Sequence, residues 1–91
     1  MGRSRQPRPE KLAEKLKEIR LKLGLTQTQM FELLGETKTA LYVGHIALYE
    51  NDQRVPPLLV LLRYSRVAHI PMEILIDDEI DLPNSLLNEN H

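Results

Sequence analysis

Side chains able to do chemistry are few in this sequence, and they do not gather in a catalytic pattern. The histidines, His45, His69 and His91, are far apart along the chain, and the sequence has no cysteine. The acidic run at residues 77–79 supplies carboxylates but has no matching base or nucleophile beside it. General acid–base and nucleophilic catalysis need such groups together. We therefore expect a protein that is not an enzyme.

Metal ligands and targeting segments are equally scarce in the sequence. No two histidines are three or four residues apart, and no glycine-rich phosphate loop is present, so we expect no metal and no other cofactor. Because the sequence has no cysteine, it cannot form disulfides, and nothing in it indicates an oxidising compartment. The longest apolar run, residues 55–62, contains two prolines. It is far shorter than the roughly 20 residues that cross a bilayer. We expect a cytoplasmic protein with no membrane partner.

Charge is divided unevenly between the two halves of the chain. Residues 1–38 carry nine Lys or Arg against five Glu, whereas residues 39–91 carry three Arg against eight Asp or Glu. The overall net charge of −1 hides this split. A basic half suits a polyanion such as nucleic acid, while a split of this kind can also serve solubility alone.

The composition favours an all-α domain with an aliphatic core. The 91 residues allow one domain, and 42% of them are hydrophobic although there are only three Tyr, one Phe and no Trp. Apolar residues recur at helical spacing, and no alternating strand pattern is present. Caps, glycines and prolines delimit five expected helices, at residues 9–23, 27–34, 42–50, 57–69 and 71–76.

The first two helices carry clear sequence signals. Helix 9–23 has one apolar stripe, and its lysines, Lys15 among them, are expected on the solvated faces. Gly24 should end this helix in the left-handed conformation. Thr26 and Gln29 match a capping box that opens the second helix, whose buried side is expected to be Met30, Leu33 and Leu34.

Helix 57–69 is apolar over most of its surface. Leu58, Leu61, Leu62 and Ser65 are expected on its buried face, and Leu59 and Val60 extend the apolar surface around it. A monomer of this size cannot bury so much. We therefore expect a homodimer, with Leu59 and Leu62 at the dimer interface.

The chain ends differ in composition from the middle. Residues 1–8 form a basic arm that includes Arg3 and Arg5 and is expected to be disordered alone. It either follows a phosphate backbone or enters a minor groove, or it is an ordinary frayed terminus. Residues 77–91 form an acidic extension, which either packs back on the domain at residues 9–76 or covers a dimer surface.

Three segments together resemble a known family. Leu25-Thr26-Gln27-Thr28-Gln29-Met30, Ile46-Ala47-Leu48-Tyr49-Glu50 and Arg54-Val55-Pro56 are similar to the phage-repressor and Cro family, also called the XRE family. The resemblance covers residues 9–76. It implies a five-helix repressor-like bundle whose helix-turn-helix binds double-stranded DNA, with the helix at residues 42–50 entering the major groove as recognition helix. The turn before that helix is longer here than is usual in the family.

The resemblance also implies roles for particular positions. Thr26 and Gln27 would lie at a backbone phosphate, and Glu50 would be structural, pairing inside the domain. Base edges would be reached from Val43, Gly44 and Leu48, and the sugar-phosphate backbone from Asn51, Gln53 and Arg54. The residues themselves add Lys38 and Tyr42 as phosphate contacts, His45 as a single hydrogen-bond donor or acceptor, and the arginines of the arm.

Two functions remain open from the sequence. The first is a homodimeric transcriptional regulator, repressor or activator, that binds an operator as double-stranded DNA. The second is a helix-turn-helix module that acts through a protein partner, as an antitoxin or assembly factor does. The apolar Val43 and Leu48 suit the second, because they offer no hydrogen bond to a base. The basic arm and Lys38 favour the first.

Overall fold

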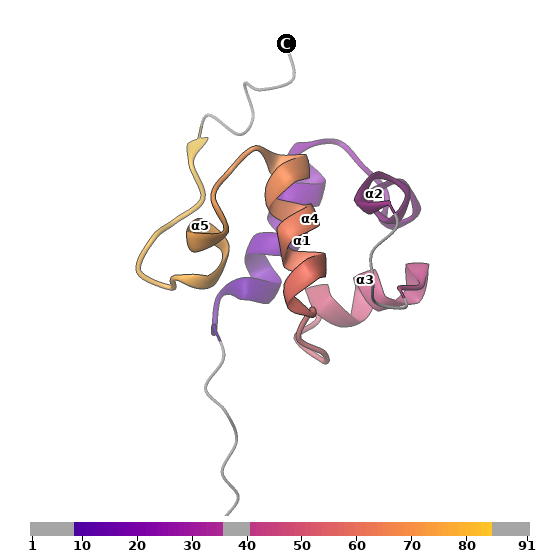
Figure 1. Cartoon of the computed structure of the whole chain (residues 1–91), viewed down its shortest axis with the longest axis horizontal. Helices are drawn as coiled ribbons and strands as arrows, with labels where there is room; N and C mark the ends of the chain where they lie inside the picture. Colours follow the sequence, from indigo (N-terminus) through magenta and orange to yellow (C-terminus); the bar gives the residue numbers. More distant parts are fainter. Residues whose placement is uncertain (1–8, 36–40, 85–91) are drawn as a thin grey trace, which may run out of the picture.

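The structure is a computed structural model that describes residues 9–35 and 41–84 of the chain. Its helices are α1 (Leu12–Lys22), α2 (Gln27–Leu34), α3 (Val43–Glu50), α4 (Leu58–Ala68) and α5 (Met72–Ile76). In Figure 1, α5 lies on one side of α1 and α4, while α2 and α3 lie on the other. The described residues contain no strand. The expectation of an all-α fold with five helices is confirmed.

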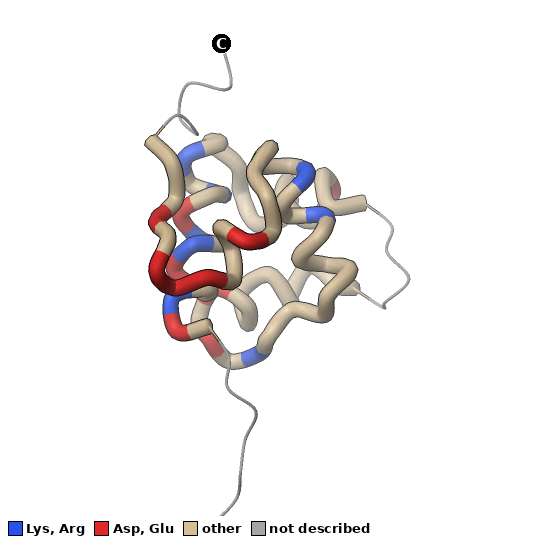
Figure 2. The backbone as a smooth tube through the Cα atoms, turned by 60° about the vertical axis from the view of Figure 1, so that its left-hand side comes forward, with Lys and Arg blue, Asp and Glu red and all other residues tan. Residues whose placement is uncertain are grey.

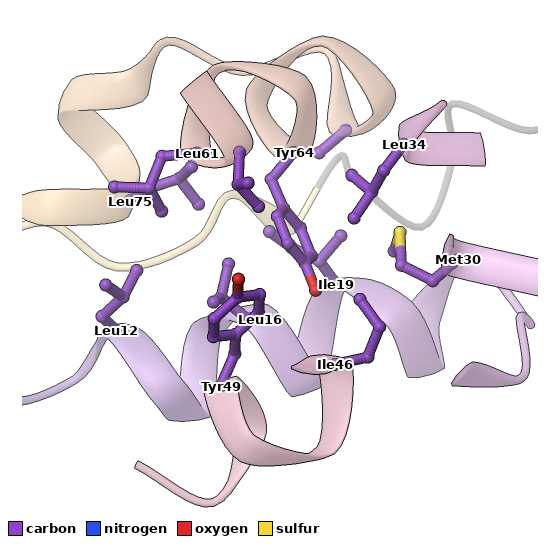
Figure 3. Packing of buried hydrophobic residues seen from close by; sticks show 12 residues of the cluster. Leu12, Leu16, Ile19, Met30, Leu34, Ile46, Tyr49, Leu61, Tyr64 and Leu75 are labelled. Atoms are coloured by element: carbon purple, nitrogen blue, oxygen red, sulfur yellow. The ribbon is translucent and has the colours of Figure 1, made fainter. Parts of the chain in front are cut away.

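One aliphatic core joins the helices. Figure 3 shows side chains from all five helices meeting around Leu16, Ile19 and Tyr64, each of which is fully buried. The other buried hydrophobic residues are Leu12, Met30, Leu34, Ile46, Tyr49, Val60, Leu61, Ala68 and Leu75. Burial raises the pKa of the Tyr64 phenol well above its ordinary value.

The first helix begins later than its sequence predicts. Helix α1 starts at Leu12 rather than near Pro9, because the segment before it is bound by a residue from the other end of the chain. The Asp78 carboxylate accepts the backbone N–H groups of Glu10 and Lys11, at 2.9 and 3.0 Å. At the other end Gly24, with φ of +74°, ends the helix in the left-handed conformation as predicted.

Lys15 does not lie on a solvated face. Its side chain is buried, and its Nζ donates to the carbonyl oxygens of Ile74 and Asp77, at 2.7 and 2.9 Å. These carbonyls lie at the C-terminal end of α5, where no intrahelical partner is available. The expectation for Lys15 was wrong because helical spacing gives a residue's face but not what lies over that face.

The acidic segment after α5 packs back on the domain. Asp78 binds the start of α1, and Leu82 packs against the hydrophobic core. Figure 2 shows the acidic residues of this segment beside the basic and acidic residues of α1. Of the two alternatives open from the sequence, packing back on the domain describes residues 77–84.

Three apolar side chains lie differently from the predicted faces. Leu33 is 53% exposed, and Leu58 is 69% exposed, although both were expected to be buried. Val60, assigned to the excess surface of the fourth helix, is fully buried. The predicted face of α4 was rotated, because α2 and α5 pack against α4 from two directions and bury Val60, Leu61 and Tyr64 together.

Candidate nucleic-acid interface

A reciprocal cap fixes the start of α2. The Thr26 Oγ1 accepts the backbone N–H of Gln29 at 3.0 Å, and the Gln29 Oε1 accepts the backbone N–H of Thr26 at 2.8 Å. Such a cap is worth about 1 kcal/mol. The predicted capping box is confirmed. The cap occupies the Thr26 hydroxyl, and the resemblance places Thr26 at a backbone phosphate.

The end of α2 is fixed from α4. The Arg63 Nε donates to the carbonyl oxygen of Leu34 at 2.6 Å. The next residue, Gly35, has φ of +69°, so the chain leaves the helix in a conformation that favours glycine. A Cβ placed there would meet the Arg63 guanidinium at 2.6 Å. The backbone conformation favours glycine at position 35, and a larger residue would also have to displace the Arg63 guanidinium.

Helix α3 presents one edge to solvent. Ile46 and Tyr49, which are three residues apart on one face of the helix, point into the core. Tyr42 at the N-terminal end is 66% exposed and Val43 is 41% exposed, and Gly44 beside them is exposed. The residues that follow on this edge, His45, Ala47 and Leu48, are half-buried. The predicted bounds of the recognition helix are confirmed.

An ion pair between half-buried Arg20 and buried Glu50 anchors the far end of α3. The Arg20 Nε and Nη2 donate to the two carboxylate oxygens of Glu50, at 2.7 and 3.0 Å. The hydrogen bonds that Arg20 donates to the Glu50 carboxylate raise the pKa of Arg20, and burial opposes this rise. The pair joins α1 to α3. The structural role expected for Glu50 is confirmed.

Gln27 joins the same network from the first turn of α2. Its Nε2 donates to the Glu50 Oε1 at 3.3 Å. The side chain that the resemblance placed at a phosphate is therefore held between α2 and α3. The Arg20 Nη1 also donates to the carbonyl oxygen of Leu25 at 3.0 Å, which fixes the turn between α1 and α2.

The turn after α3 is exposed from residue 51 to residue 55. Asp52 has φ of +60°, a left-handed conformation that aspartate adopts more readily than most residues. The backbone N–H of Gln53 donates to the carbonyl oxygen of Leu48 at 2.9 Å, which closes the turn against the helix end. Asn51, Gln53 and Arg54 are thereby presented beside α3.

His45 connects the two ends of the exposed edge. Its Nδ1 accepts the backbone N–H of Tyr42 at 3.2 Å, and its Nε2 lies 3.3 Å from the Arg54 Nη1. The His45 ring is 5.4 Å from the Tyr42 ring and 6.0 Å from the Tyr49 ring. The structure thus brings Tyr42, His45 and Arg54 into one cluster on α3 and the turn that follows it.

The described part of this surface is poor in positive charge. In residues 26–35 and 41–57, Arg54 is the one basic side chain. Three of the predicted contacts, Arg3, Arg5 and Lys38, lie outside the described residues. Within the described residues, no group of three or more acidic, histidine or cysteine side chains could hold a metal ion. None of their helices is long and apolar enough to cross a membrane.

The sequence did not reveal the residues that hold the helices in place. Arg20, Lys15, Asp78 and Arg63 each bind a partner at least 29 residues away along the chain. No local pattern marks such a residue. The sequence showed that Lys15 and Asp78 are charged. It did not show which backbone carbonyl or N–H groups they bind.

An all-helical bundle with two short helices packed together and the outer edge of the second exposed defines a helix-turn-helix protein. The family model described as helix-turn-helix matches residues 16–75, and the chain belongs to this family. The match confirms the resemblance to the XRE type, and the domain is a DNA-binding regulatory domain in general. Comparison with the curated proteins and with the solved structures gives no significant match.

Proposed function

We propose that the chain is a transcriptional regulator that binds double-stranded DNA as a homodimer, with α3 in the major groove of a palindromic operator. The carrying observation is the contrast between the two faces of α3. Its inner face is fixed by Ile46, Tyr49 and the Arg20–Glu50 pair, while Tyr42, Val43 and Gly44 form an open outer edge. A rigidly held helix with a free edge is what groove insertion requires.

Phosphate contacts are proposed at both sides of this edge. Thr26 and Gln27 lie at the N-terminal end of α2, where the helix dipole and the backbone N–H groups that the cap does not use favour an anion, although the Gln27 side chain is held by Glu50. Tyr42 is exposed at the start of α3 and Arg54 is exposed after its end. Asn51 and Gln53 lie beside Arg54 in the same turn. Lys38, Arg3 and Arg5 are also proposed to contact phosphates, and they would add positive charge to the DNA-binding surface.

Base contacts are proposed from an edge that is largely apolar. Val43, Gly44 and Leu48 have no side-chain donor or acceptor, so their contribution is contact with thymine methyl groups and fit to the shape of the groove. Among the helical residues of this edge, His45 has a side chain that can form a hydrogen bond, and Tyr42 before the helix is assigned to a phosphate. The proposal therefore places most of the affinity in phosphate contacts and a smaller part in base readout.

The homodimer is supported by apolar surface at the start of α4. Leu59 is 39% exposed and Leu62 is half-buried, and beside them Leu58 and Val55 are 69% and 41% exposed. A two-fold dimer would bury this surface and match the symmetry of a palindromic site.

A second candidate function is a helix-turn-helix module that binds a protein. The observation that favours it is the same outer edge of α3, because exposed Tyr42 and Val43 are residue types suited to a protein interface. Arg54 alone supplies positive charge to the described part of that edge.

A gel shift with random-sequence duplex distinguishes the two. The full chain is titrated into duplex at low and moderate salt, beside a pull-down from a cell extract. A regulator shifts the duplex at low salt, and the shift weakens as salt rises. Failure to shift any duplex at low salt, together with capture of one stoichiometric protein partner, would favour the protein-binding module.

A further inference from the structure

The His45 ring lies between two hydrogen-bond donors. On one side the backbone N–H of Tyr42 points at Nδ1, with 3.2 Å between the nitrogens. On the other side the Arg54 Nη1 lies 3.3 Å from Nε2. The Tyr42 amide belongs to the residue that precedes α3, and Arg54 belongs to the turn that follows α3. His45 therefore contacts both ends of the exposed edge.

The chemistry of imidazole allows only one of these bonds at a time. A neutral histidine ring carries one N–H and one lone pair, and which nitrogen carries the proton depends on its partners. The arginine guanidinium stays protonated and can only donate hydrogen bonds, and a backbone N–H can likewise only donate. With the proton on Nε2, the ring accepts the Tyr42 N–H at Nδ1. Its Nε2–H and the Arg54 N–H are then both donors, so they form no hydrogen bond with each other. With the proton on Nδ1, the ring accepts from Arg54 and leaves the Tyr42 amide without this acceptor.

Neighbouring side chains hold the ring close to both donors. His45 is half-buried, and the aromatic rings of Tyr42 and Tyr49 lie within 5.4 and 6.0 Å of it. Arg54 supplies the positive charge beside the ring. Burial raises the pKa of Tyr49, and the charge of Arg54 opposes that rise by a smaller amount. The ring accordingly has two described hydrogen-bonding partners on opposite nitrogens and one lone pair to share between them.

We propose that His45 and Arg54 act as one coupled unit, in which capture of Arg54 by a DNA phosphate fixes the His45 proton on Nε2. The proposal rests on the proposed DNA-binding function. A phosphate binds the Arg54 guanidinium and withdraws it from Nε2. Nδ1 gives its proton to solvent and Nε2 takes one from solvent, so the ring stays neutral. The Nδ1 lone pair then serves the Tyr42 amide at the start of α3.

The consequence is a specified donor on an otherwise apolar helix edge. Once Arg54 has moved, the Nε2–H of His45 points to the side that the guanidinium occupied. In the major groove, such a donor selects a base edge with an acceptor, namely guanine O6 or N7, adenine N7 or thymine O4. The exocyclic amino groups of cytosine and adenine are disfavoured there. Phosphate contact by Arg54 is thereby linked to base selection by His45.

The first test needs no DNA. The 15N resonances of the histidine rings in the labelled full chain show which nitrogen of His45 carries the proton, at a pH where the ring is neutral. His45→Gln identifies the signals, since His69 and His91 remain. Arg54→Ala is expected to move the population toward the Nε2–H form, and Arg66→Ala, which removes an exposed arginine from α4, is expected to leave it unchanged. Equal populations in the parent and in Arg54→Ala would overturn the coupling.

The second test adds duplex to the same samples and measures binding. Duplex is expected to move the parent ring toward the Nε2–H form, to an extent similar to Arg54→Ala. The affinities of Arg54→Ala, His45→Gln and the double variant should then depart from additivity by about twofold or more. Glutamine is the informative replacement, because at this third helical position its oxygen can accept the Tyr42 N–H and its amide keeps a permanent donor.

The two tests separate failure of this inference from failure of the proposed function. A tautomer shift in Arg54→Ala combined with no DNA binding by the parent would keep the His45–Arg54 competition, but would overturn both its DNA role and the proposed function. Tight DNA binding with no shift in either test, or with additive variants, would overturn the inference and leave the proposed function standing.

Discussion

Arg20 on α1 and Glu50 at the end of α3 form a two-point ion pair, with Nε–Oε2 of 2.7 Å and Nη2–Oε1 of 3.0 Å. The Glu50 side chain is 2% exposed and the Arg20 side chain is 12% exposed. Because Gln27 of α2 also donates to Glu50, one carboxylate joins three helices. The exposed edge of α3 keeps its orientation relative to α2 through this carboxylate.

Removing the charge of Glu50 should therefore be costly. Glu50→Gln leaves the half-buried Arg20 guanidinium without its counter-charge, and we expect the free energy of unfolding to fall by about 3 kcal/mol. Urea denaturation at neutral pH measures it. The matched control is Lys22→Ala, which breaks the Lys22–Glu18 pair on the surface of α1 and should cost about 0.5 kcal/mol or less. Equal losses in the two variants would show that Glu50 is not an anchor.

A second prediction concerns stability in acid. The backbone N–H groups of Glu10 and then Lys11 lower the pKa of Asp78 below its ordinary value of 3.8. A carboxylate with a lowered pKa in the folded state stabilises it above that ordinary value, and the contribution is lost as the pH falls through the folded-state pKa. Asp78→Asn should thus be less stable than the parent at neutral pH, and the difference should shrink below about pH 4.

Thermal unfolding of both proteins from neutral pH to strong acid tests this dependence. Glu79→Gln is the control, because Glu79 is the exposed neighbour of Asp78. It should change stability little at any pH. A deficit in Asp78→Asn that stayed constant down to the acid limit would contradict the assigned role of the carboxylate.

A third prediction compares two glycines on the helix-turn-helix. Gly35→Ala puts a side chain where φ is +69° and where the Arg63 guanidinium lies 2.6 Å away, so we expect a loss of more than about 1 kcal/mol. Gly44→Ala adds a methyl group inside α3, with no described atom within 4 Å, and should stabilise the protein by about 0.5–1 kcal/mol. Circular dichroism with urea measures both. Changes of the same sign in the two variants would contradict this description of the turn.

The fourth prediction concerns assembly through α4. We expect sedimentation at micromolar concentration to give a dimer, and Leu59→Glu to give a monomer because it puts a charge in the proposed apolar interface. Leu21→Glu is the matched control, since Leu21 is 57% exposed on α1, and it should remain dimeric. A parent that sediments as a monomer, or a Leu59→Glu variant that stays dimeric, would show that this surface is not the interface.

Sequence patterns predicted the elements of the fold better than they predicted contacts between elements. Caps and glycines act locally, so Thr26, Gln29 and Gly24 marked helix ends correctly. The buried face of α4 was misjudged because it is set by two neighbouring helices, and Leu58 and Val60 exchanged their expected environments. Lys15 was taken as a surface charge, and no partner was named for Asp78, because their partners lie 59 to 68 residues away along the chain.

The candidate site shows the same division. The resemblance named the structural role of Glu50 correctly, because that role follows from residue type at a fixed spacing. The contact between His45 and Arg54 was not foreseen, since it depends on how the turn after α3 folds back. The predicted contacts of Lys38, Arg3 and Arg5 remain predictions, because they lie outside the described residues.

The central claim is that this helix-turn-helix holds DNA mainly through phosphates, and the salt dependence of binding tests it most directly. Fluorescence anisotropy gives the affinity for random duplex at a series of salt concentrations, for the parent and for Arg54→Ala, Lys38→Ala and the control Arg66→Ala. We expect the parent to bind with a steep slope, and Arg54→Ala and Lys38→Ala each to lower it by about one unit while weakening binding to all duplexes alike. No binding by the parent at about 50 mM salt, or unchanged slopes in both variants, would contradict the claim.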